Sequence, residues 1–193
     1  MTDPLTKALL EARNGGPKLP DTYGEGLTRE RIFAVQTEVA SALGSVGGFK
    51  VACPPGAPII IAPIMAHDIY ESPAKISLSE GEEAGVELEY AFRLIAPVPD
   101  PAAFDFEARL RDSVELLPAF ELVQSRLANP KGAGAALKML DNQLNGAVVL
   151  GEACRDWQGI DVTSAQAHLT LGDATLLDGV AKVPGEGAFA TLC

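Results

Sequence analysis

Two glutamates in the run Val86–Phe92 have the type and spacing to bind a cation. Successive side chains of a strand point to opposite faces, so Glu87 and Glu89 share one face while apolar residues share the other. Their backbones lie roughly 7 Å apart along a strand, which lets both carboxylates reach one ion. An ordinary half-buried strand with a solvated outer face shows the same alternation. The pattern of Glu87 and Glu89 by itself therefore does not distinguish a cation site from a solvated strand face.

A third glutamate, Glu121, lies in Ala119–Val123, a segment that is apolar on both faces. An isolated carboxylate is costly to bury, so this group must be neutral, paired or bound to a metal. Arg126 is the candidate partner for a structural ion pair, and a divalent ion is the alternative. Three converging carboxylates would raise one another's pKa values unless a cation neutralised them. Mg²⁺ or Mn²⁺ accepts such an oxygen set and keeps positions for substrate and water.

The composition is that of one globular domain, or one domain with a small appendage, and it is acidic. The 193 residues are 47% hydrophobic, and 26 acidic against 15 basic residues give a net charge of −11. Such a chain repels phosphate backbones and anionic lipid, so we expect neither a nucleic acid nor a membrane as a partner. The N-terminus does not resemble a secretory signal. The three cysteines form no Cys-x-x-Cys pair and are typical of reduced thiols, so we expect a cytoplasmic protein.

The order of the predicted elements, helices first and strands later, is typical of an α+β fold. Residues 1–46 are predicted as an N-terminal helical segment, with one helix that stops at Asn14 and a second that runs from its N-cap Thr28 to Gly44. Residues 47–193 are predicted as a β-rich catalytic domain. Its expected strands span 49–53, 58–62, 86–94, 117–123 and 146–150, its helices span 103–110 and 133–140, and a hairpin turns at Gly172-Asp173.

An ordered set of short motifs resembles the fumarylacetoacetate hydrolase superfamily, and within it the branch of 2-keto-4-pentenoate hydratase and 4-oxalocrotonate decarboxylase. No single motif is specific for this superfamily, but the ordered set of motifs is much more specific. In sequence, the motifs are Gly48-Phe49-Lys50, Val86-Glu87-Leu88-Glu89, Pro118–Val123 with Ser125-Arg126, Asp141-Asn142 and Val148–Gly151. The resemblance begins at the helix after Thr28 and reaches about Gly187.

This resemblance implies a mixed β-roll of the fumarylacetoacetate hydrolase type with an N-terminal helical portion. It also implies a site with a metal, an acid/base pair and substrate-binding residues. Mg²⁺ or Mn²⁺ would be bound by Glu87, Glu89 and Glu121, protons would be moved by Lys50 and Asp68, and substrate would be bound by Ser125, Arg126 and Asn142. The implied partner is a small 2-oxo acid, and we expect a homo-oligomer.

The implied activity is that of a metal-dependent hydro-lyase of aromatic catabolism, a 2-keto-4-pentenoate hydratase. Decarboxylation of a 4-oxalocrotonate-type diacid and hydrolysis of an acylpyruvate would use the same ligands. A hydrolase would ordinarily use a His-Glu pair to activate water, and the sequence offers no convincing pair near the N-terminal helix, which favours the two lyases.

Three departures from the family pattern favour a rival interpretation. Gln124 stands where relatives often have Asp, and Gln143–Asn145 replaces the usual small residues. The chain ends at Cys193, where relatives continue, so the C-terminal part of the catalytic domain is expected to be missing. The rival is a non-catalytic relative that binds an oxo acid or serves as a structural subunit.

Overall fold

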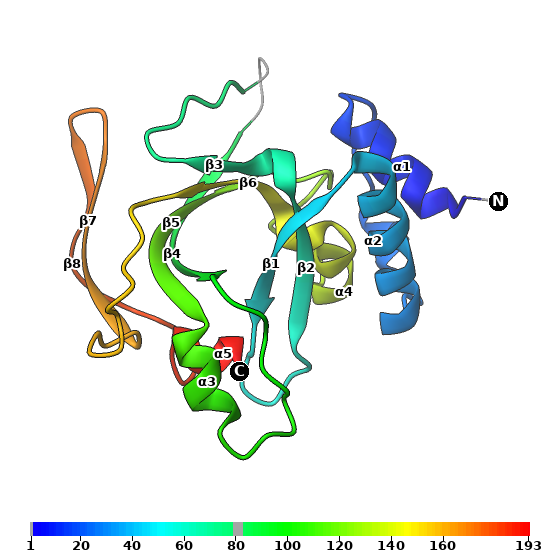
Figure 1. Ribbon diagram of the computed structural model, residues 1–193. Coiled ribbons are helices and arrows are strands. Elements are labelled where there is room, and N and C mark those ends of the chain that lie inside the picture. Colours follow the sequence, from blue (N-terminus) through cyan, green and yellow to red (C-terminus); the bar gives the residue numbers. More distant parts are fainter. Residues whose placement is uncertain (1, 79–82) are drawn as a thin grey trace. The chain divides into compact units, whose positions relative to one another are not determined.

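The computed structural model describes residues 2–78 and 83–193 and shows an α+β protein (Figure 1). Its helices are α1 (Pro4–Arg13), α2 (Arg29–Leu43), α3 (Phe106–Asp112), α4 (Ala135–Leu140) and α5 (Ala188–Leu192). Its strands are β1 (Val46–Ala52), β2 (Ile60–Met65), β3 (Ile69–Glu71), β4 (Gly85–Leu94), β5 (Val114–Val123), β6 (Asn145–Leu150), β7 (Ser164–Leu171) and β8 (Ala174–Lys182). The prediction of an α+β fold is therefore confirmed.

Local sequence signals account for the ends of the first two helices. The Asp3 carboxylate accepts a hydrogen bond from the Leu5 N–H at 2.9 Å and caps α1, whose first residue is a proline. The Thr28 hydroxyl caps α2 by accepting from the Arg31 N–H at 3.3 Å. The helix ends at Gly44, whose φ of 127° suits glycine. Both predicted helices are confirmed.

Apolar residues of α1, α2 and α4, together with three residues from loops, form a buried core of eleven residues. This burial, rather than helix propensity, holds these short helices in place. The core consists of Leu5, Leu9, Leu19, Ile32, Val35, Val39, Leu127, Ala133, Leu137, Met139 and Leu140.

Arg13, the last residue of α1, is a largely buried cation, and its Nε has no hydrogen-bond partner among the described residues. Burial lowers the pKa of Arg13 to about 10, with a further lowering by the charge of Arg126. The folded state therefore disfavours this charge at every pH below that value. We expect Arg13→Met to raise the free energy of unfolding by about 1 kcal/mol, because an apolar side chain suits this environment better. Urea denaturation measures the change, and a loss of stability would contradict it.

The strands form one four-stranded sheet and two smaller ribbons. The large sheet has the order β3-β6-β5-β4, with β3 parallel and β5 antiparallel to β6. In its register Glu121 of β5 lies opposite Val148, and a bulge separates Leu122 from Val123, which pairs with Asn145. Strands β1 and β2 pair with each other, and β7 and β8 form the predicted hairpin. The sequence did not predict β3, whose three residues are too few to show alternation and pair with a strand about 80 residues later.

The chain divides into two compact units. The first comprises Met1–Val51, Ile60–Glu89 and Ala119–Gly151, and the second comprises Ala52–Ile59, Tyr90–Pro118 and Glu152–Cys193. In the second unit the buried Trp157 packs against the rings of Phe92 and Phe189 at 5.1 and 5.3 Å. The predicted boundary between residues 1–46 and 47–193 stays a prediction.

Across residues 2–78 and 83–193, no helix has both the length and the apolar character that a membrane crossing requires.

Candidate metal centre

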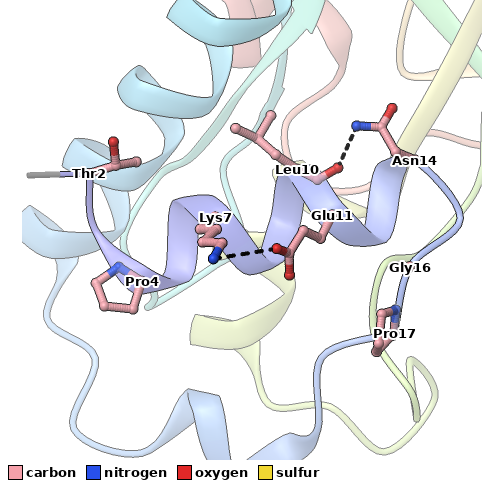
Figure 2. A pocket seen from close by; sticks show the side chains of 8 residues that line it. All are labelled: Thr2, Pro4, Lys7, Leu10, Glu11, Asn14, Gly16 and Pro17. Carbon is pink, nitrogen blue, oxygen red and sulfur yellow. Dashed lines mark hydrogen bonds and ion pairs between the residues drawn. The ribbon is translucent and has the colours of Figure 1, made fainter.

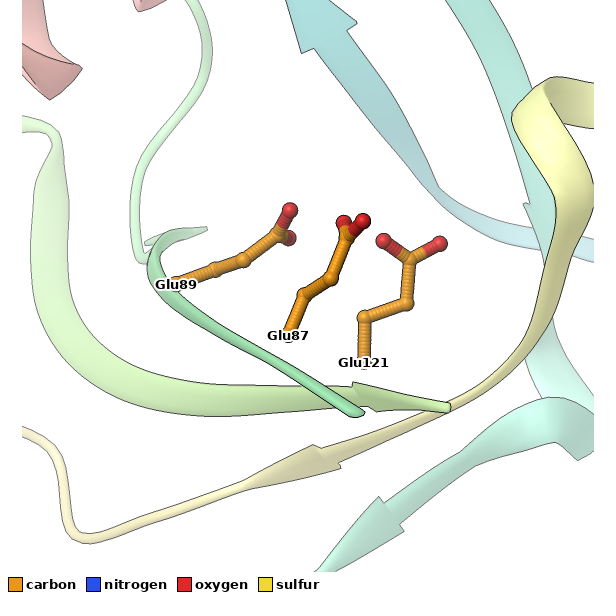
Figure 3. Close-up of side chains that lie close together, drawn as sticks. All are labelled: Glu87, Glu89 and Glu121. Carbon is orange, nitrogen blue, oxygen red and sulfur yellow. The ribbon is translucent and has the colours of Figure 1, made fainter. Parts of the chain in front are cut away.

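The three predicted glutamates lie together in the first unit (Figure 3). Glu87 and Glu89 project from β4 and Glu121 from β5, and one carboxylate oxygen of each lies within 4.8 Å of the others. Glu121 is 1% exposed, whereas half of the Glu87 side chain is exposed. The cluster therefore has a buried carboxylate at its base and solvent access from β4.

Lys50 of β1 supplies the positive charge of this cluster. Its ammonium donates hydrogen bonds to Glu121 Oε2 and, at 2.9 Å, to Glu87 Oε2. Its Nζ also lies 3.6 Å from an oxygen of Glu89. The cluster contains one ammonium group and three carboxyl groups, so acidic groups outnumber basic ones. The position of the ammonium is one from which a small cation contacts all three carboxyl groups.

The pKa values follow from burial and from Lys50. Burial raises the pKa of Glu121 to about 7, although the hydrogen bond from Lys50 opposes it. Burial also raises the pKa of Glu89. For Glu87 the effect of burial is outweighed by the hydrogen bond and charge of Lys50, so its pKa is lowered. Burial disfavours the Lys50 ammonium, but Glu121 and Glu87 overcome it and raise the pKa of this lysine.

The ion-pair partner offered by the sequence for Glu121 is wrong. Arg126 instead donates from Nε to Asp141, and the two side chains are 6% and 0% exposed. Its Nη atoms donate to three backbone carbonyls, those of Gln124, Asp141 and Asn145, at 2.6–2.8 Å. Strand β5 ends at Val123, so the arginine lies beyond the strand that carries Glu121.

The other predicted site residues lie in the same unit but not in the carboxylate cluster. The Ser125 hydroxyl donates to Asp141 at 3.2 Å, and the Asn142 amide donates to the Pro63 carbonyl at 3.3 Å. Asp68 follows β2, and its carboxylate lies 3.7 Å from His67. In the part of the chain that the structure describes, Lys50 and Asp68 form no ion pair with each other. Their joint role in proton transfer stays a prediction.

Sequence reasoning missed Asn145 as part of this centre. Its amide donates to Glu121 Oε1 at 2.8 Å, and the residue is 3% exposed. The available signal was the departure at Gln143–Asn145 from the pattern that the sequence resembles.

The donor set fits a divalent ion on its chemistry. All three candidate ligands are carboxylate oxygens, which hard cations such as Mg²⁺ prefer. The position that a cation would take already attracts an ammonium group. Glu87, Glu89 and Glu121 are therefore the residues that could hold the ion.

An open pocket along α1 has a different character (Figure 2). Its lining charges, Lys7 and Glu11, lie 3.7 Å apart and pair with each other, and the Asn14 amide donates to the Leu10 carbonyl. It contains none of the predicted site residues, and we assign it no function.

No family model and no curated protein matches the sequence. Among solved structures, the fold is similar to that of 4-oxalocrotonate decarboxylase from Pseudomonas putida G7. The complex of that protein with calcium and acetate gives a TM-score of 0.61 at 15% identity, covering 76% of this chain and 60% of the other. Its complex with magnesium and adipate gives 0.59 at 11% identity, covering 82% and 66%.

These comparisons establish the fold of the chain and the share of each compared structure that it covers. The chain has the fold of a 4-oxalocrotonate decarboxylase over most of its own length, and it spans 60–66% of the length of those structures. 4-Oxalocrotonate decarboxylase belongs to the fumarylacetoacetate hydrolase superfamily, which the sequence motifs resemble.

Proposed function

We propose that this protein is a divalent-metal-dependent lyase for small 2-oxo acids. The observation that carries the proposal is the convergence of Glu87, Glu89 and Glu121 on one cation position. The fold supports it, because the similar decarboxylase structures are complexes with calcium or magnesium. The proposal also includes the fold type and the ion: a mixed β-roll of the fumarylacetoacetate hydrolase type that binds Mg²⁺ or Mn²⁺. It further includes a cytoplasmic location and a homo-oligomeric state.

In this proposal, the three glutamates hold an ion that polarises the 2-oxo group of the substrate when bound. Glu121 is buried, and its side chain excludes water from the base of the site. Lys50 holds a proton at Nζ beside the carboxylates and delivers it to the substrate. Asp68 accepts the hydroxyl proton that the substrate loses and passes it to the lysine, which restores the ammonium. Substrate is bound by Ser125, Arg126 and Asn142.

The reaction we propose is hydration of 2-hydroxypenta-2,4-dienoate. Proton transfer to the terminal carbon, with loss of the hydroxyl proton, converts the dienol into the conjugated 2-oxo-enoate. Water then adds across the carbon–carbon double bond, and the product is 4-hydroxy-2-oxopentanoate. Lys50 and Asp68 are the acid and base for the first step.

Decarboxylation of a 4-oxalocrotonate-type diacid is the second candidate. The fold comparison favours it, because the two structures reported above are decarboxylases and one of them is a complex with adipate, a dicarboxylate. The carbon–carbon bond to the departing carboxylate breaks, its electrons pass into the conjugated 2-oxo system, and carbon dioxide leaves. The same three ligands serve both candidates.

A purified-protein assay tests the proposal. The protein is incubated with Mg²⁺ or Mn²⁺ and 2-hydroxypenta-2,4-dienoate, and the loss of diene absorbance is followed, with a parallel measurement of carbon dioxide release from 2-oxo-3-hexenedioate. Metal-dependent turnover of either compound supports a lyase and identifies which one. Bound metal without turnover of either would favour the non-catalytic relative.

Lys50→Met separates the two roles that we give this lysine. We expect Mg²⁺ to bind at least about tenfold more tightly, because an ammonium near three carboxylates competes strongly with a second cation for the same oxygens. We expect turnover to fall to background, because the proton donor is gone. Calorimetric titration and the absorbance assay measure the two effects.

The matched control is Lys7→Met, which removes a lysine whose side chain is 75% exposed on α1. Neither metal affinity nor turnover should change in that variant. Weaker Mg²⁺ binding in Lys50→Met would show that the lysine supports the ion rather than competing with it.

A further inference from the structure

The two carboxylate oxygens of Glu121 have different partners. Oε2 faces the cluster and accepts from Lys50, whereas Oε1 accepts a hydrogen bond from the Asn145 amide at 2.8 Å. Glu121 and Asn145 are both almost completely buried, at 1% and 3% exposed. Water therefore does not compete for Oε1, and only one oxygen of Glu121 is directed toward a cation.

Asn145 is held firmly by the chain around it. Its carbonyl accepts from Arg126 Nη1 at 2.8 Å. The preceding residues Asn142–Leu144 all have φ between 49° and 64°, a left-handed conformation that is costly without glycine. Two backbone bonds fix this turn: the Leu144 N–H donates to Asp141, and the Gln124 N–H donates to Leu144, at 2.8 and 2.9 Å. The amide of Asn145 is thus fixed before any ligand arrives.

One available oxygen on Glu121 matters because divalent ions differ in how they use carboxylates. Ca²⁺ takes six to eight oxygens and commonly binds both oxygens of one carboxylate, whereas Mg²⁺ requires a compact octahedron. A glutamate restricted to one oxygen suits the octahedral ion. We propose that Asn145 makes the site selective for Mg²⁺ over Ca²⁺ by keeping Glu121 Oε1 away from the ion. The proposal rests on the proposed metal site.

The test compares the affinities for Mg²⁺ and Ca²⁺ of the unmodified protein with those of one variant. Mg²⁺ and Ca²⁺ are titrated separately by calorimetry into the unmodified protein and into Asn145→Ala. We expect the Mg²⁺ affinity to fall about tenfold, the loss typical when a partner of a metal ligand is removed. The Ca²⁺ affinity should hold or rise, because Glu121 then offers both oxygens. Asn145→Ser, whose hydroxyl is too short to reach Oε1 directly, is used with the same expectation if the alanine variant does not fold.

Gln36→Ala is the matched control. Gln36 is also a buried amide of the first unit, 4% exposed, but it donates to the Met139 carbonyl and contacts no glutamate of the cluster. Its loss should leave the ratio of the two affinities unchanged. An equal fall for both ions in Asn145→Ala, or no change for either, would overturn the selectivity role. Absence of binding of either ion to the unmodified protein would instead contradict the proposed metal site.

Discussion

Glu121→Gln is expected to weaken Mn²⁺ binding at least about a hundredfold while the chain stays folded. Removal of a group that only orients a ligand costs about 10- to 100-fold, so loss of a ligand charge should cost no less. The fold should tolerate the change, because burial raises the pKa of Glu121 to about 7 and so already disfavours its charge. The glutamine carbonyl can still accept the hydrogen bond from Asn145, and Lys50 keeps its hydrogen bond to Glu87. Calorimetry measures the affinity, and circular dichroism reports the fold.

Glu115→Gln provides the control for this result. Glu115 lies on the same strand, is 5% exposed, and pairs with Arg93 and Arg155 at 3.2 and 3.4 Å in the second unit. Both variants remove a buried carboxylate from β5, but only Glu121 belongs to the cluster. Retained Mn²⁺ affinity in Glu121→Gln, or an equal loss in Glu115→Gln, would remove the support for the ligand assignment.

Asp141→Asn is expected to lower the free energy of unfolding by about 3–5 kcal/mol, the usual cost when one partner of a buried ion pair is removed. The Arg126 guanidinium would stay buried without a counter-charge, since its remaining bonds go to uncharged carbonyls. The two Asp141 oxygens now accept from the Arg126 backbone N–H, at 2.9 Å, and from its Nε, and the single oxygen of asparagine can keep only one of these bonds. Urea denaturation measures the loss.

Glu11→Gln provides the comparison. It breaks the exposed pair between Lys7 and Glu11, which lie four residues apart on α1. Such a pair contributes about 0.3–0.5 kcal/mol, so the variant should be almost as stable as the parent. A loss below about 1 kcal/mol in Asp141→Asn would show that the buried pair does not hold this part of the fold.

The parts of the fold that the sequence predicts are those with local signals. The second helix has its N-cap at Thr28 and its stop at Gly44, and both signals act within one turn of the helix ends. The hairpin around Gly172 likewise depends on neighbouring residues. Strand β3 carries no such signal, because its pairing with β6 arises only in the folded chain.

The same distinction applies to the candidate site. Alternation along one strand predicts that Glu87 and Glu89 share a face, and the apolar setting of Glu121 predicts that it is buried. The charge that balances Glu121 is on Lys50, 71 residues earlier, and the amide that orients it is on Asn145, 24 residues later. No spacing rule connects residues so far apart, which is why Arg126 was the obvious but wrong partner.

The most direct test of the central claim is a crystal structure of the protein soaked in Mn²⁺, with anomalous difference density measured at the manganese edge. We predict one strong peak, bonded by one oxygen each of Glu87, Glu89 and Glu121, with the Lys50 ammonium moved away from the carboxylates. Density without a peak between these side chains, and with Lys50 still bonded to Glu121, would contradict the account.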